Sequence, residues 1–151
     1  MQAVVMTAAG GPETLELREI PEPEIRTPNQ LKVRLKATGV NPIDTKLRAR
    51  GLFYPEALPA VLGCDGAGVV TEVGGAVSRY RPGDEVWFCN GGLGGEAGNY
   101  AELTLVEESA ARPKPESLSF IEAAAAPLVL ITAWEALYDR GRLLAGKRVL
   151  V

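Results

Sequence analysis

Short apolar or alternating runs recur along the first hundred residues, separated by turns rich in Gly and Pro, and this spacing constrains the fold most. Residues 31–37 (LKVRLKA) alternate strictly between apolar and charged positions, as in a strand with one buried face and one wet face. Gly74-Gly75 and Pro82-Gly83-Asp84 are turn signals. Many short strands at this spacing predict a small barrel or sandwich. The expected strands are Gln2–Met6, Thr14–Arg18, Leu31–Thr38, Gly68–Val73, Glu85–Phe88 and Tyr100–Val106.

Helical signals appear at two places in the chain. Asn41 followed by Pro42 suits the cap and first position of a short helix. Ser119 and Glu122 have the spacing of a capping box, so a helix is expected to begin there, before Pro127 interrupts it. A second helix is expected from about Leu128 to Arg140.

The chain therefore changes character after Pro115, from β-rich to helical. Gly141 is expected to end the second helix, and Lys147–Val151 (KRVLV) reads as the start of a buried strand. We predict a β domain over residues 1–118 and the beginning of an incomplete α/β domain over residues 119–151.

The sequence contains no histidine, which excludes Ser-His-Asp triads, Cys-His pairs and HExxH zinc sites. Its two cysteines, Cys64 and Cys89, are not arranged as a CxxC pair, so we expect reduced thiols and no metal site. The net charge of −3 gives no reason to expect nucleic acid or an anionic membrane as a partner. The N-terminus lacks the pattern of a signal peptide, and we expect a cytoplasmic protein.

Two short segments carry polar residues that chemistry could use. In Gly39–Asp44 (GVNPID), Asn41 and Asp44 either cap the predicted helix or line a functional loop. In Leu62–Val70 (LGCDGAGVV), Asp65 is either a buried hydrogen-bond acceptor or a site residue, and Cys64 is expected to be a small buried side chain. These alternatives remain open on the residues alone.

Gly92–Ala97 (GLGGEA) fits a loose GxGxxA pattern, but it is not read as a dinucleotide fingerprint. That motif lies between a strand and a helix, whereas residues 100–106 alternate like a strand. We expect a flexible loop.

Five motifs together resemble the medium-chain dehydrogenase/reductase superfamily, and most closely its quinone oxidoreductase (zeta-crystallin-like) group. The resemblance covers the whole chain and implies a GroES-like β-barrel followed by a Rossmann domain, of which Lys147–Val151 would be the first strand. On this reading the chain is the N-terminal portion of such a protein. The motifs, in order, are GVNPID (39–44), LGCDGAGVV (62–70), RPGDEVW (81–87), NYAE (99–102) and LITAWEAL (130–137).

The same superfamily includes zinc-dependent alcohol dehydrogenases, and the chain departs from them at the ligand positions. Asn41 stands at the position of the first zinc-binding Cys, Cys64 at that of the His, and Leu128 at that of a further Cys. The four-cysteine structural zinc lobe is also missing. The resemblance therefore implies a zinc-free enzyme.

For the zinc-free branch, the resemblance implies hydride transfer from NADPH, with NADH as the alternative, to a quinone or an α,β-unsaturated carbonyl. Asn41 would lie near the nicotinamide and the substrate, Thr132 would contact the nicotinamide end of the cofactor, and Asp44 would orient the cleft wall. Tyr54 would either donate a proton to the product enolate or act as an aromatic clamp at the cleft edge.

Other readings stay open. The chain could be a non-catalytic GroES-like binding module, or belong to an alcohol dehydrogenase or enoyl-thioester reductase of the same superfamily. The full-length enzyme is expected to be a homodimer. The 151-residue chain alone is expected to be inactive, because the glycine-rich phosphate loop of the family is not in it.

Overall fold

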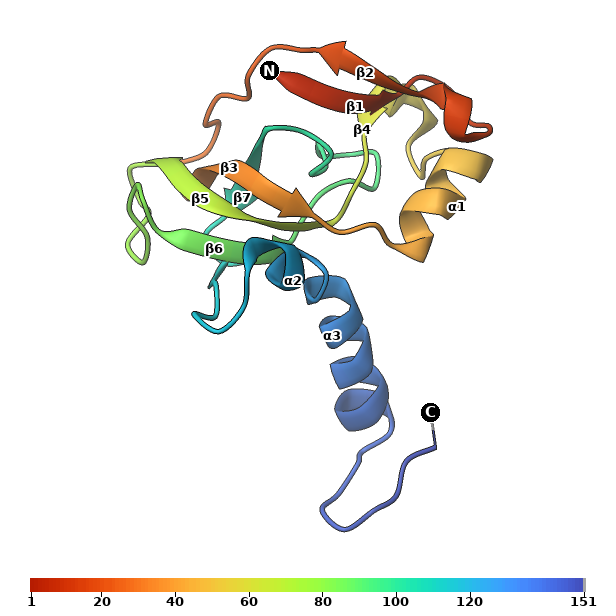
Figure 1. Cartoon of the computed structure of the whole chain (residues 1–151), viewed down its shortest axis with the longest axis vertical. Helices are drawn as coiled ribbons and strands as arrows, with labels where there is room; N and C mark the ends of the chain where they lie inside the picture. Colours follow the sequence, from red (N-terminus) through yellow and green to blue (C-terminus); the bar gives the residue numbers. More distant parts are fainter. Residues whose placement is uncertain (151) are drawn as a thin grey trace.

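The computed structural model describes residues 1–150, which form two antiparallel sheets and three α-helices (Figure 1). A five-stranded sheet has the order β7-β3-β5-β6-β8, and a three-stranded sheet has the order β2-β1-β4. The strands are β1 Gln2–Met6, β2 Leu15–Glu19, β3 Gln30–Thr38, β4 Ala60–Val61, β5 Asp65–Val73, β6 Glu85–Cys89, β7 Leu103–Glu107 and β8 Arg112–Pro113. The mainly β fold expected from the spacing of the apolar runs is confirmed.

The strands of the described residues do not close into the expected barrel. The two sheets are joined by an isolated bridge between Ala3 and Ala101. At the opposite edge of the larger sheet, β8 has only two residues, and Pro113 has no N–H to donate. That edge therefore cannot support a ladder that would complete the closure.

The alternating segment forms β3, an interior strand of the larger sheet between β7 and β5. Leu31 and Val33 of β3 are fully buried, whereas Arg34 points to solvent. At Gly68 of β5, an added Cβ would lie only 2.2 Å from the carbonyl oxygen of Arg34, so the close pairing of β3 and β5 requires glycine there. The main core consists of Leu31, Val33, Val70, Tyr80, Val86, Phe88, Val106 and Ala111.

The helices begin where the local signals predict. Helix α1 (Pro42–Arg50) follows Asn41, and α2 (Phe120–Ala124) follows Ser119. The Ser119 hydroxyl accepts from the Glu122 N–H at 3.3 Å, and the Glu122 carboxylate accepts from the Ser119 N–H at 2.8 Å, which completes the capping box.

The last helix projects away from both sheets (Figure 1). It comprises α3 (Pro127–Trp134) and a π-helical extension, Glu135–Arg140. Gly141 ends it, as predicted, by donating its N–H to the Ala136 carbonyl at 2.9 Å. No helix in residues 1–150 is both long and apolar enough to span a bilayer.

The strand expected at Lys147–Val151 is not formed over the residues of it that the structure describes. Residues 147–150 are irregular, and Leu150 is 99% exposed. A buried strand needs ladder partners on a neighbouring strand, and no strand among residues 1–150 pairs with this segment. Val151 lies outside the described residues.

Candidate functional site

The side chain of Asp65 joins three elements that are far apart in the sequence. Asp65 opens β5 and is 1% exposed. One carboxylate oxygen, Oδ2, accepts from Asn41 Nδ2 at 2.9 Å, and the other, Oδ1, accepts from the Leu128 N–H at 3.0 Å. One buried carboxylate therefore ties the residue that precedes α1 to the first turn of α3.

Burial raises the pKa of Asp65, because the charged form loses its hydration. The hydrogen bonds from Asn41 and the Leu128 N–H act in the opposite direction, since both donate to the carboxylate. Burial is the stronger effect, so the ionised form of Asp65 is held at a cost in free energy.

A second carboxylate holds the loop before α1 from the other side. Asp44 Oδ2 accepts from the Asn41 backbone N–H at 2.8 Å and from the Tyr100 hydroxyl at 2.9 Å. Asp44 Oδ1 is buried and has no hydrogen-bond partner among the described residues. Burial and the hydrogen bond to Asp44 both raise the pKa of Tyr100, so the phenol remains a donor. The polar cluster, defined as Asn41, Asp44, Asp65 and Tyr100, is thus continuous.

The three positions that correspond to zinc ligands do come together. Asn41 and Leu128 both bind Asp65, and Cys64 directly precedes it. Their chemistry does not suit zinc, because one thiol, an amide already bonded to a carboxylate and an aliphatic side chain make no tetrahedral donor set. No cluster of three His, Cys, Asp or Glu residues able to hold a metal occurs in residues 1–150.

A small pocket of about 310 Å³ opens beside the polar cluster. Its lining is mostly apolar, with two thiols and one amide side chain at the wall. None of the four residues of the polar cluster lines this pocket, whereas Ile43, Cys64 and Leu128, which adjoin or contact the cluster, do. The lining residues are Ile43, Cys64, Cys89, Asn90, Gly91, Leu93 and Leu128.

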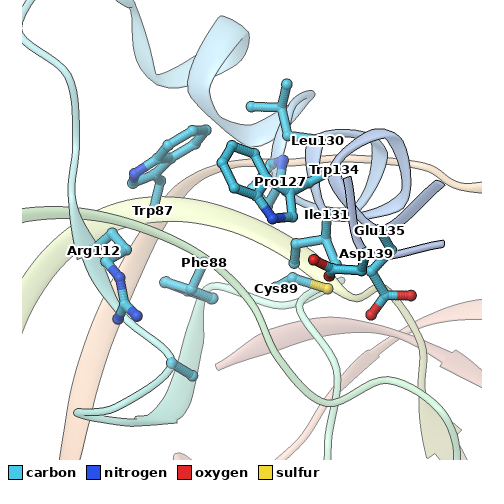
Figure 2. Close-up of a pocket in the computed structure, with 11 residues that line it drawn as sticks. Trp87, Phe88, Cys89, Arg112, Pro127, Leu130, Ile131, Trp134, Glu135 and Asp139 are labelled. Carbon is cyan, nitrogen blue, oxygen red and sulfur yellow. The ribbon is translucent and has the colours of Figure 1, made fainter. Parts of the chain in front are cut away.

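A larger groove of about 780 Å³ lies between α3 and β6 (Figure 2). Figure 2 shows Trp87, Ile131 and Trp134 around it, with Cys89 at its base and Glu135 and Asp139 at one end. The helical spacing of residues 130–138 predicts an apolar face on this helix. Such a face normally packs against another part of the protein. In the structure it is open: Leu130 is 53% exposed and Trp134 is 61% exposed. The helical spacing marks the apolar face, but no local pattern marks the groove beside it.

Thr132 and Tyr54 lie outside the polar cluster. Thr132 is exposed on α3, and its hydroxyl donates to the Leu128 carbonyl at 2.8 Å. Tyr54 is 55% exposed and precedes a short 3-10 helix, Pro55–Ala57. Its ring lies near the loop of residues 91–95, since a Cβ at Gly95 would be 3.7 Å from Tyr54 Cε2. Of the predicted site residues, the structure brings Asn41 and Asp44 together and leaves these two apart.

The glycine-rich loop around Gly92 packs against protein backbone. Gly92 has a φ of 76°, and an added Cβ would be 2.5 Å from the Gly63 carbonyl oxygen. No helix follows within the next ten residues. These contacts account for the glycine without a phosphate, in agreement with the rejection of a dinucleotide fingerprint.

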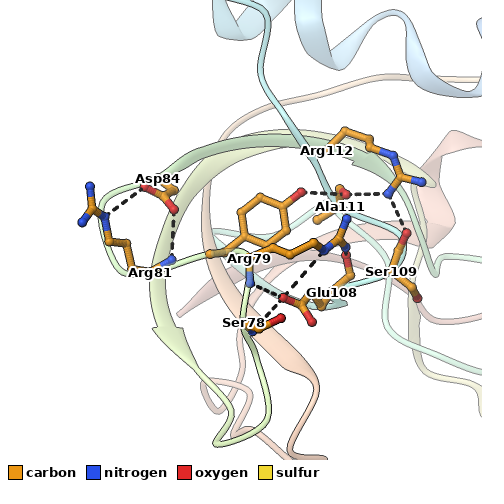
Figure 3. A network of polar contacts seen from close by, with 9 residues as sticks. Ser78, Arg79, Arg81, Asp84, Glu108, Ser109, Ala111 and Arg112 are labelled. Atoms are coloured by element: carbon orange, nitrogen blue, oxygen red, sulfur yellow. Dashed lines mark hydrogen bonds and ion pairs between the residues drawn. The ribbon is translucent and has the colours of Figure 1, made fainter.

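A separate polar network joins the turn at residues 78–84 to the segment 108–112 (Figure 3). Glu108 accepts from the backbone N–H groups of Ser78 at 2.9 Å and Arg79 at 2.6 Å. The Tyr80 hydroxyl donates to the Ala111 carbonyl at 2.9 Å. These bonds, most of them to backbone groups, hold loops in place, and we assign the network a structural role.

Comparison with known proteins gives consistent matches. Residues 27–116 match the family described as alcohol dehydrogenase GroES-like domain. The chain is 36% identical over 151 residues to a quinone oxidoreductase of Mus musculus, covering 100% of this chain and 44% of that protein. It is 40% identical over 158 residues to the chloroplastic NADPH-dependent alkenal/one oxidoreductase of Arabidopsis thaliana, covering 100% of this chain and 40% of that protein.

Among solved structures, a similar fold is that of Escherichia coli quinone oxidoreductase complexed with NADPH. The TM-score is 0.81 at 33% identity, over 93% of this chain and 41% of that one. The chain thus spans less than half the length of the relatives it matches.

Proposed function

Because the chain belongs to the alcohol dehydrogenase GroES-like family, in the quinone oxidoreductase group of the medium-chain dehydrogenase/reductase superfamily, we propose that it forms the substrate side of a zinc-free, NADPH-dependent reductase. The substrate class is a quinone or an α,β-unsaturated carbonyl, as the names of two relatives suggest. The observation that carries the proposal is the Asn41–Asp65–Leu128 link, which holds a hydrogen-bond donor where a zinc-dependent relative would hold metal.

When bound, the nicotinamide supplies a hydride to the electron-poor double bond. Negative charge then develops on the substrate oxygen and needs a donor. One Nδ2 hydrogen of Asn41 is used by Asp65, and the second is the donor we assign to that oxygen. Asp65 keeps the amide in one orientation, so little reorganisation is required during the reaction.

The remaining site residues have supporting roles in this proposal. The Thr132 hydroxyl hydrogen is already donated to Leu128, so its oxygen is free to accept from the carboxamide N–H of the nicotinamide. Asp44 fixes the Asn41 backbone. Tyr54, at the exposed edge, either protonates the product enolate or clamps the substrate ring.

We further propose that residues 1–118 are the substrate-side domain and that residues 119–151 begin a dinucleotide-binding domain. We also propose that the full-length protein is a homodimer. The groove between α3 and β6 supports the division, because it leaves the apolar face of α3 open for packing.

The test is a substrate screen with the full-length protein that carries this chain, following the loss of reduced-nicotinamide absorbance. Quinones and enones should be reduced, whereas a saturated ketone should not. Asn41→Ala should lower kcat by about 10²–10³, the usual effect of removing one oxyanion donor. Asn29→Ala is the matched control, because the Asn29 side chain is exposed and its backbone carbonyl, which accepts from the Glu108 N–H, is unchanged by the substitution.

Folding must be measured alongside turnover, since Asn41 is buried. If kcat per folded molecule is the same for Asn41→Ala and Asn29→Ala, Asn41 is only a structural residue. Failure to oxidise NADPH with any quinone or enone would reject the proposed activity as a whole.

A further inference from the structure

The two cysteines lie one position out of register, Cys64 just before β5 and Cys89 at the end of β6. In the β5–β6 ladder Asp65 pairs with Cys89, and the Asn90 N–H donates to the Cys64 carbonyl at 2.8 Å. In a regular ladder, residues one position out of register point to opposite faces, but Cys64 lies in a bend just before β5 and is not part of the ladder. A hydrogen bond joins the two thiols, so only a small movement is needed to bring the sulfurs to bonding distance.

Both cysteines are free, and both line the 310 Å³ pocket beside the polar cluster. Cys64 is buried, at 4% exposed, whereas Cys89 is half-buried and also reaches the groove between α3 and β6 (Figure 2). A small reagent can therefore approach the pair from the pocket.

The two thiols differ in acidity. A hydrogen bond with the Cys89 thiol lowers the pKa of Cys64, against the opposing effect of burial. The same bond, together with burial, raises the pKa of Cys89. Cys64 therefore forms the thiolate more readily, and Cys89 retains its proton.

We propose that Cys64 and Cys89 are a redox-active dithiol that hydrogen peroxide converts into a disulfide. The Cys64 thiolate attacks a peroxide oxygen, the O–O bond breaks, and the departing hydroxide is protonated to water, which leaves a sulfenic acid. The Cys89 sulfur then attacks the Cys64 sulfur, the S–O bond breaks, and the hydroxide leaves as water with the Cys89 proton. Two electrons pass from the sulfurs to the peroxide.

The bond has a direct consequence for the neighbouring site. It ties the residue before Asp65 to the end of β6 and removes both thiols from the pocket wall. The dithiol is thus a switch that alters the pocket, and its chemistry does not depend on the proposed reductase activity.

The test exposes the fully reduced chain to hydrogen peroxide and measures its intact mass without reductant. The expected product is a monomer lighter by two hydrogens, which dithiothreitol restores. Tryptic cleavage after Arg79 separates the two cysteines, so a cross-linked peptide pair identifies the bond. The disulfide should form about tenfold faster in the native chain than in urea, because only the fold holds the thiols together.

Single variants provide the controls. Cys89→Ser should accumulate a sulfenic acid at Cys64 that dimedone traps, and neither Cys89→Ser nor Cys64→Ser can give the lighter monomer. Equal rates in native and unfolded chains would overturn the proposal. So would a wild-type product made only of intermolecular dimers or of sulfinic acids.

Discussion

The side-chain amide of Asn41 donates to the Asp65 carboxylate at 2.9 Å, across 24 residues of sequence. The same residue uses its backbone N–H to bond Asp44 at 2.8 Å, so Asn41 is held on two sides by buried carboxylates. It is therefore fixed in place before any substrate arrives. A residue that is both part of the core and the assigned donor must be tested by variants that separate stability from activity.

The stability of the chain should depend on pH through Asp65. Its folded pKa is raised above the ordinary value of 3.8, so between these two values the native state binds more protons than the unfolded state. The free energy of unfolding should then fall as pH rises through this window and level off above the raised pKa. Asp65→Asn removes this titration.

Urea denaturation at a series of pH values measures the effect. The stability of the wild type relative to Asp65→Asn should be greatest at low pH and should decrease as pH rises. Asp139→Asn, at an exposed position, should run parallel to the wild type. A relative stability that increases with pH would mean that the ionised carboxylate is stabilised by the fold.

Tyr100→Phe should destabilise the chain by about 1–3 kcal/mol, because it removes one of the donors to a buried carboxylate. Asp44 already has one oxygen without a partner, so the loss cannot be offset there. Tyr54→Phe is the matched control at an exposed site and should change stability by less than about 0.5 kcal/mol. Equal effects in chemical denaturation would show that the Tyr100–Asp44 bond contributes nothing.

Local signals predicted much of this fold. The alternation around Leu31 and Val33 predicted the strand β3, and the Ser119–Glu122 capping box predicted the start of α2, because each depends on neighbouring residues. The bond from the Leu128 N–H to Asp65 links residues 63 apart, and no local pattern contains it.

The segment Lys147–Val151 shows that a local pattern can also predict an element that does not form. Its apolar composition favours a strand, yet residues 147–150 have no ladder partner and remain irregular. The open groove at Trp134 was also not predicted, because its openness depends on which elements pack against α3. An apolar face predicts that something covers it, but not whether the covering element is present in the same chain.

Purified protein should contain little zinc, below about 0.1 ion per chain. The positions that would supply ligands hold Asn41, Cys64 and Leu128, and two of these lack a suitable donor atom. Elemental analysis of protein prepared without metal-affinity steps checks the expectation. One equivalent that survives dialysis against a chelator would contradict it.

The 151-residue chain alone should bind NADPH weakly, with a Kd above about 1 mM, because no helix N-terminus within residues 1–150 is open to the phosphates. Dinucleotide phosphates usually bind at helix N-termini. In the described part of the chain, the N-terminus of each of the three α-helices already faces an acidic side chain: Asp44 at α1, Glu122 at α2 and Asp65 at α3. A phosphate brought to any of them would meet a like charge.

The nicotinamide end offers little compensation. In the proposed site, Asn41 and Thr132 would contribute a few neutral hydrogen bonds of about 0.5–1.5 kcal/mol each, which is too little to immobilise a flexible dinucleotide. Calorimetric titration of the chain with NADPH is the measurement, and Escherichia coli quinone oxidoreductase, solved as an NADPH complex, is the positive control. Micromolar binding by the 151-residue chain would show that the phosphates have a site within these residues, and the cofactor assignment would have to move with it.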